Sequence, residues 1–243
     1  MNEVFLHVDS EQIDQKNFSL SKSESHHFIK SLRGEIGDRV WLLDGNGSAY
    51  HSEVRNVDNY NVKGVIIDSF RNYGESQNDL RLILGLIKGS RMDLAIEKAV
   101  EFGIKSIHPI IFERSIRKSI NLDRLNKIII ASAKQSGRSF FPILNEPVKF
   151  SNWLEKHNKE VSVVCHFSGN SINDIITKNS HSVNIIVGPE GDFSENEISL
   201  LRDYNIPFVK LGPRRLRSES ACISAILSIN QITELKYARM YIL

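Results

Sequence analysis

The sequence predicts an α/β protein in which a small β-rich region precedes a larger region built on a mostly parallel sheet. Within the first 70 residues, short strand-like runs flank "GNGS", a typical hairpin turn. After residue 80, apolar strand-like runs alternate with helical ones, a pattern typical of a parallel sheet covered by helices on both faces. The polar segment 71–79, "RNYGESQND", is the best candidate for a linker between the two regions.

Each region divides into elements with recognisable ends. Asn121 is placed to cap one helix, and Gly103 and Gly137 are placed to end two helices. In the first region, the spacing fits a compact antiparallel barrel or sandwich with one short helix at 21–33. Its strands are expected at 4–8, 38–44, 49–57 and 60–68. In the second region, strands are expected at 80–88, 104–112, 161–167, 183–188 and 206–212, and helices at 90–103, 121–137, 194–205 and 218–235.

Composition indicates an ordinary soluble globular protein. The chain has 243 residues, of which 41% are hydrophobic and 25% are charged. Cys165 and Cys222 lie in apolar runs, which favours reduced core cysteines in a cytoplasmic protein. We expect no signal peptide, no membrane span and no metal, because no basic leader, long apolar run or metal-ligand spacing occurs. Residues 81–143 hold 12 Lys/Arg against 5 Asp/Glu, a local excess that suits a polyanion such as nucleic acid or a solvated helical surface.

The chemistry is expected in loops that follow strands, because ligands of open α/β sheets bind beyond the carboxyl ends of the strands. Three loops qualify: the one after Phe167, Gly188-Pro189-Glu190-Gly191, and the segment 211–217. The phosphate-binding motifs GxxxxGK[ST] and GxGxxG are absent at strand ends. The Glu190 carboxylate suits hydroxyl or amine donors or a cationic ligand, as S-adenosylmethionine offers. Ser194 and Glu197 form a capping-box pattern and need no further role.

The stretches "IIVGPEGDFSENEI" and "LGPRRLRSESACISAI" together resemble the RsmE family of ribosomal RNA methyltransferases, in the SPOUT superfamily. "KGSRMDLAIEKAVEFGIKSIHPI", "ERSIRK", "ASAKQSGRSFFP" and "HHFIKSLRGEIGDRVWLLDGNG" resemble further family segments in the same order, so the resemblance covers the whole chain. It implies a PUA-like β-barrel RNA-binding domain at 1–72 and a SPOUT methyltransferase domain with a trefoil knot at 73–243. It also implies a cytoplasmic homodimer that uses S-adenosylmethionine to methylate N3 of a uridine in 16S ribosomal RNA, near the decoding region of the small subunit.

The resemblance also assigns residues. Arg217 and Glu219 are candidate catalytic groups; the alternative is that both only cap the last helix. His26 and His27 are interpreted as solvated or structural. For the cofactor, the candidates are His166, Gly188, Pro189, Glu190, Gly191, Leu211, Gly212, Leu216, Arg217 and Ser220. For RNA, the candidates are Arg33, Lys88, Arg91, Arg114 and Arg138, each of which could instead be a surface charge.

The chain departs from the family pattern at a few positions. Asp192 stands where a second glycine is usual, and Arg215 stands where Ile or Val is usual. Ser218 and Ser220 replace threonines and keep the hydroxyl, and Lys134 replaces an acid. Two other functions stay open: a SPOUT methyltransferase acting on another RNA position, and a non-catalytic RNA-binding assembly factor. Cofactor binding would separate the second from an enzyme.

Overall fold

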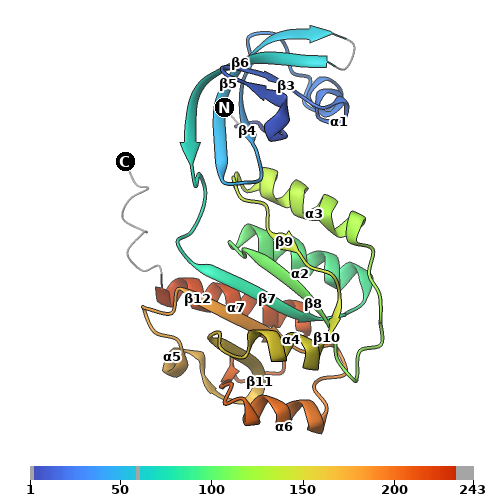
Figure 1. Ribbon diagram of the computed structural model, residues 1–243, viewed down its shortest axis with the longest axis vertical. Coiled ribbons are helices and arrows are strands. Elements are labelled where there is room, and N and C mark those ends of the chain that lie inside the picture. The colour runs from blue at the N-terminus through green and yellow to red at the C-terminus, as the bar shows by residue number, and fades with distance from the viewer. Residues whose placement is uncertain (1–2, 59–60, 234–243) are drawn as a thin grey trace. The chain divides into compact units, whose positions relative to one another are not determined.

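The computed structural model describes residues 3–58 and 61–233, which form two compact units. The first unit comprises the chain up to Glu75 together with Ile130–Phe141. The second comprises Ser76–Ile129 together with the residues from Pro142 onward. Helix α3 (Leu122–Gln135) therefore begins in the second unit and ends in the first. Each unit has its own sheet (Figure 1). Each unit also has its own apolar core.

The first unit is a six-stranded sheet in the order β1-β4-β5-β6-β3-β2. β1 runs parallel to β4, whereas the other neighbouring pairs are antiparallel. A short helix, α1 (Lys22–His26), continues into a π-helical turn at His27–Ser31. Phe28 from this turn joins the apolar core of the unit. The strands are β1 (Phe5–His7), β2 (Ile13–Asp14), β3 (Asn17–Ser19), β4 (Arg39–Leu43), β5 (Ser48–Asp58) and β6 (Asn61–Arg71).

The second unit is a seven-stranded sheet in which every pair among the described residues is parallel. Its order is β10-β8-β7-β12-β11-β13, with β9 paired to β8. Parallel strands require crossover connections, which the intervening helices supply. The strands are β7 (Asp79–Gly85), β8 (Ser106–Ile111), β9 (Ile143–Leu144), β10 (Val148–Lys149), β11 (Ser162–Ser171), β12 (Ser182–Val187) and β13 (Phe208–Lys210).

Helices cover both faces of this sheet, as Figure 1 shows. α4 (Phe150–His157) and α6 (Glu195–Asp203) pack apolar side chains onto one face, where they join Ile83, Val164 and Ile186 in a buried cluster. α2 (Gly89–Glu101) packs along α7 (Ser218–Thr233), which lies against β7 and β12. α5 (Ile172–Ile175) is a single turn after β11. The predicted α/β class, with a mostly parallel sheet, is confirmed.

The predicted helix ends are confirmed where capping chemistry marked them. The Asn121 side chain accepts a hydrogen bond from the Arg124 amide, as an N-cap does. Gly103 ends α2 with a φ of +91°, a conformation that glycine adopts without strain. Ser194 and Glu197 form the predicted capping box at the start of α6. Glu197 also accepts a hydrogen bond from the Glu113 amide and so ties α6 to the loop after β8.

Other elements were not predicted. The pairing of β1 with β4 is parallel, so the expectation of a wholly antiparallel first sheet is wrong. β2, β3, β9 and β10 are too short for a periodic pattern to reveal them, and α4 was missed. The strand predicted at 161–167 continues to Ser171. Tyr60 and residues 234–235, which belong to one predicted strand and one predicted helix, lie outside the described residues.

Candidate functional site

A cavity of about 340 Å³ opens at the carboxyl ends of β11, β12 and β13. This is the edge of a parallel sheet where ligands bind, and the volume lies within the usual range of small-molecule sites. Both Gly-Pro loops that the sequence singled out contribute to it. The loop expected after Phe167 does not, because those residues continue β11 to Ser171, and this strand contributes Cys165, His166 and Phe167 instead. Its lining consists of Arg91, Cys165, His166, Phe167, Val187, Gly188, Pro189, Glu190, Asp192, Phe193, Val209, Lys210, Leu211, Gly212, Arg214, Arg215, Leu216, Arg217, Ser218 and Ala221.

The first Gly-Pro loop is joined to the start of α7, directly after the second Gly-Pro loop. The Ser218 hydroxyl, at the start of α7, donates a hydrogen bond of 2.8 Å to the Gly188 carbonyl. Ser218 is buried, so this bond is shielded from water. The replacement of the family's threonine by serine at this position therefore keeps a hydroxyl that closes the cavity wall.

Glu190 binds to the protein's own helix. One of its carboxylate oxygens accepts a hydrogen bond of 3.1 Å from the Lys88 amide, the residue that precedes α2. The same oxygen lies 3.6 Å from a guanidinium nitrogen of Arg91, in the first turn of α2. A carboxylate is favoured at a helix N-terminus, because unsatisfied amides and the helix dipole are positive there. Glu190 thus fixes α2 to the loop after β12 and still lines the cavity.

Gly191 serves packing at the back of this loop. A Cβ at this position would lie 2.8 Å from the Arg114 carbonyl oxygen, so no larger residue fits without a shift of the backbone. The Arg114 side chain donates a hydrogen bond of 3.0 Å to the Phe193 carbonyl and holds the same loop. Gly191 itself stands outside the cavity lining.

Arg91 also approaches a second carboxylate. Its Nε lies 3.8 Å from Oε1 of Glu219, in the first turn of α7. Glu219 is only 6% exposed, and its other oxygen is buried without a hydrogen-bond partner among the described residues. A buried carboxylate needs a compensating charge, and Arg91 is the cation beside it. Arg91 thus lies between Glu190 and Glu219 on the wall of the cavity.

Asp192, where the family has a glycine, adopts the backbone conformation that glycine favours, with a φ of +64°. Asp is one of the few residues that tolerate this left-handed region, because its short side chain can bond locally. Here one carboxylate oxygen accepts a hydrogen bond of 2.9 Å from the Phe193 amide. The loop therefore keeps the geometry of a glycine loop and gains a carboxylate on the cavity wall.

The predicted catalytic and cofactor residues are largely brought together. Arg217 is exposed on the rim of the cavity, whereas Glu219 contacts Arg91 behind the lining. Ser220 is exposed and stands outside the lining. The His166 ring lies in the wall, with Nδ1 2.7 Å from the Ser168 hydroxyl. The predicted residues that line the cavity are His166, Gly188, Pro189, Glu190, Leu211, Gly212, Leu216 and Arg217.

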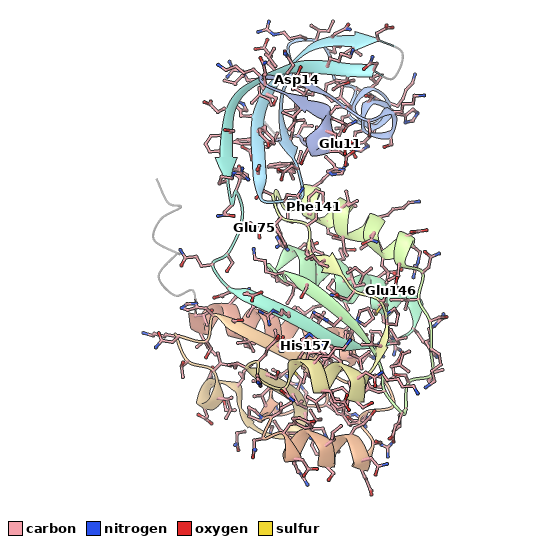
Figure 2. The ribbon with its side chains drawn as sticks, in the orientation of Figure 1. Glu11, Asp14, Glu75, Phe141, Glu146 and His157 are labelled. Atoms are coloured by element: carbon pink, nitrogen blue, oxygen red, sulfur yellow. The ribbon has the colours of Figure 1, made fainter. Side chains whose placement is uncertain are left out.

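The candidate RNA contacts are dispersed. Arg33 and Lys88 are exposed, and Arg33 lies in the first unit. Arg138 is 2% exposed and forms a two-pronged pair with Glu75, which Figure 2 labels, with distances of 2.9 and 3.1 Å. Both residues belong to the first unit, and both side chains are buried. This burial argues against the predicted phosphate contact and favours a structural role.

The cysteines and titratable clusters add little chemistry. Burial raises the pKa of the Cys165 thiol to about 12, and burial also raises the pKa of Cys222 well above its usual value, so both stay protonated at neutral pH. Both are free thiols. Within residues 3–58 and 61–233, no group of three or more His, Cys, Asp or Glu side chains could hold a metal ion. No helix in that part of the chain is long and apolar enough to cross a membrane.

Several lining residues were not assigned from the sequence. Lys210, Arg214 and Arg215 end or follow β13, and Phe167 ends the strand predicted at 161–167, so their place in the sequence is a usable signal. Cys165, Val209 and Ala221 read as core residues in apolar runs, and only the fold brings them to the cavity wall.

Comparison with known proteins defines the class. A family model for the RNA methyltransferase domain matches residues 74–230, and a model for the RNA methyltransferase PUA domain matches residues 20–67. A ribosomal RNA small subunit methyltransferase E of Mesomycoplasma hyopneumoniae is 32% identical over 215 residues, covering 86% of this chain and 92% of that protein.

Solved structures agree. A ribosomal RNA small subunit methyltransferase E from Neisseria gonorrhoeae, bound to S-adenosyl methionine, has a TM-score of 0.88 at 26% identity, covering 96% of this chain and 98% of that chain. A methyltransferase from Legionella pneumophila, in complex with the cofactor SAM, has a TM-score of 0.86 at 27% identity, covering 95% and 98%. The fold and the cavity thus define an RNA methyltransferase with an N-terminal PUA domain. The chain belongs to the ribosomal RNA small subunit methyltransferase E family.

Proposed function

We propose that this protein transfers the methyl group of S-adenosylmethionine to N3 of a uridine in 16S ribosomal RNA, uridine 1498 of the decoding region. The observation that carries the proposal is the cavity between the two Gly-Pro loops, in a chain that aligns over 96% of its length with a family structure bound to S-adenosyl methionine. We assign RNA holding to residues 1–72 and methyl transfer to residues 73–243, and we expect the active form to be a homodimer.

The lining suits this cofactor chemically. Backbone of both loops and apolar side chains such as Val187 and Leu211 provide close-fitting, non-polar surface. Glu190 and Asp192 add carboxylate oxygens, which match a ligand that carries positive charge and hydroxyl donors. We therefore assign the cofactor to Gly188, Pro189, Glu190, Leu211 and Gly212, with His166 and Leu216 at the margin. When bound, S-adenosylmethionine supplies an activated methyl group on a sulfonium.

The residues of the chain must then orient the uracil and accept its N3 proton, because N3 of a neutral uridine carries hydrogen. Arg217 is exposed on the rim, where its guanidinium can stabilise charge on a uracil oxygen or bind a phosphate. Glu219 lies behind Arg91 and is shielded from solvent. This placement favours an orienting role for Glu219, in which it fixes Arg91, over direct proton acceptance.

Methyl transfer to undermethylated small ribosomal subunits tests the proposal. Labelled S-adenosylmethionine is supplied, the RNA is digested and its nucleosides are separated. We expect the label in 3-methyluridine. Label in another nucleoside would keep the cofactor and replace the target, as a methyltransferase of another position requires. No label, together with no cofactor binding by calorimetry, would favour a non-catalytic assembly factor.

A further inference from the structure

Phe167 is an exposed aromatic ring at the mouth of the cavity. It lines the cavity, yet its side chain is 66% exposed. A single exposed apolar residue needs no explanation by itself. Phe167, however, lies on β11, whose Val163 and Val164, only four and three residues earlier, are buried. The strand therefore changes from buried to exposed within a few residues.

An irregularity in β11 coincides with this change. β11 pairs with β13 up to Cys165, opposite Val209, and resumes only at Asn170, again opposite Val209. Residues 166–169 are therefore extra chain in the strand, a bulge that re-aims side chains and is common next to active sites. Gly169 is required where the chain returns, because a Cβ there would lie 2.4 Å from backbone atoms of Phe208.

The neighbouring His166 supports the exposed ring. The two ring centroids are 4.9 Å apart, and His166 in turn packs edge-on against Phe208 at 5.6 Å. The His166 Nδ1 contact with the Ser168 hydroxyl fixes the imidazole within the bulge. Phe167 is therefore held by packing on its inner side, while its outer side is open.

Unpaired positive charge lies on the same rim. Arg214 and Arg217 are exposed and line the cavity, and neither has an ion-paired or hydrogen-bonded side-chain partner in the part of the chain that the structure describes. Leu216 between them is 40% exposed. An open aromatic face beside free guanidinium groups is the combination that binds nucleotides, through base stacking and phosphate contact.

We propose that Phe167 is the stacking surface for the target pyrimidine and that Arg214 binds the adjacent phosphate. This rests on the proposed function, since a base methylated on N3 has to leave its stack, and a platform at the cavity mouth restores part of the lost stacking. The adenine of the cofactor is the other nucleobase that could stack on the Phe167 ring, so the test must distinguish the target pyrimidine from the adenine.

Three substitutions and two measurements test the role of the ring. Phe167→Ala removes the ring, and Phe167→Tyr keeps it. Val161→Ala is the matched control, because Val161 is 61% exposed just before the opposite end of the same strand. We measure kcat/KM for undermethylated small subunits and Kd for S-adenosylmethionine by calorimetry. Phe167→Ala should lower kcat/KM by roughly 5- to 140-fold with cofactor Kd within about twofold. Phe167→Tyr should recover most of the lost kcat/KM, and Val161→Ala should match the parent.

Arg214→Ala tests the phosphate contact. The RNA affinity of this variant should be lower than that of the parent, and the slope of log affinity against log salt concentration should become shallower by about one unit. Lys159→Ala, an exposed cation before β11 on the side away from the cavity, should leave the slope unchanged.

Two outcomes overturn the platform. A parallel rise in cofactor Kd in Phe167→Ala would place the adenine on the ring, and parent-like kinetics would leave the ring without a role. Failure of the proposed function would be detected in a different measurement, namely which nucleoside the parent enzyme labels. The comparison of Phe167→Ala with the parent holds for whichever base is methylated.

Discussion

Asp192 and Arg215, two departures from the family pattern on different loops, face each other across the cavity wall, with Oδ2 and Nη2 3.9 Å apart. Their side chains are 34% and 78% exposed, so solvent screens the pair and its net contribution is below about 1 kcal/mol. The two departures are nevertheless related: the carboxylate added to one loop lies opposite the cation added to the other.

The backbone at Asp192 gives the first prediction. Asp192→Ala should be less stable than Asp192→Gly by about 1 kcal/mol, because alanine is strained at positive φ and glycine is not. Arg215→Ala is the control that removes only the ion pair. It should lower the free energy of unfolding by less than Asp192→Ala does. Urea unfolding measures all three. Equal stability of the alanine and glycine variants would contradict the left-handed conformation.

The Arg138–Glu75 pair gives the second prediction. Arg138→Ala removes the cation beside the buried Glu75 carboxylate, so the free energy of unfolding should fall by about 3–5 kcal/mol. Arg114→Ala, which removes an exposed residue, should instead weaken RNA binding and make its salt dependence shallower. If Arg138→Ala is as stable as the parent and has the shallower salt slope, the result would support the phosphate contact that the sequence predicted for Arg138.

The third prediction concerns Arg91, expected from the sequence to contact RNA and found between Glu190 and Glu219. Arg91→Ala should weaken cofactor binding and lower kcat, because both carboxylates lose their nearby cation. Arg91→Lys should recover part of the cofactor affinity by restoring the charge. An Arg91→Ala variant with unchanged cofactor Kd and a shallower salt slope would support the RNA contact instead.

The fourth prediction compares Arg217→Ala with the parent enzyme. Turnover should fall while folding, measured by circular dichroism, is unchanged, because the exposed guanidinium contributes to the reaction and little to packing. Glu219→Gln keeps the shape of the buried side chain and tests its charge separately. Near-normal turnover of a folded Arg217→Ala protein would remove Arg217 from the mechanism.

The fifth prediction is a pH effect on stability. Burial, with a smaller contribution from His157, lowers the pKa of His108 from 6.5 to about 4, while Glu160 opposes this shift and Arg81 adds to it. Between these values the unfolded chain binds a proton that the folded chain does not. The contribution of neutral His108 to the free energy of unfolding should therefore be complete above pH 6.5 and should decline as the pH falls toward 4.

His108→Asn should flatten this decline, and His26→Asn, an exposed histidine in the first unit, is the control. In a Trp41→Phe background, fluorescence of Trp153 follows unfolding of the second unit, because Trp153 stacks on His157 there at 4.8 Å. A decline of the same steepness in His108→Asn would assign the acid sensitivity to other groups.

Local chemistry made part of this protein predictable. The alternation of apolar strands and amphipathic helices, the Asn121 cap, the Gly103 stop and the Ser194–Glu197 box all act within a few residues, so the sequence alone determined them. The two Gly-Pro loops were predictable for the same reason, since a parallel sheet gathers its carboxyl ends at one edge. The loop expected after Phe167 was wrong, because β11 continues to Ser171. The trefoil knot, the homodimer and the domain boundary at 72/73 stay predictions.

Only the tertiary structure decided which charges meet. Arg138 and Arg91 read alike in the sequence as basic residues in family-like segments, yet one is buried against Glu75 and the other lies between two carboxylates. Ile130–Phe141 joins the first unit although it follows much of the second in sequence. The bulge that exposes Phe167 depends on pairing with β13, about 40 residues further along the chain. Such contacts join segments far apart in the chain, and no local pattern encodes their partners.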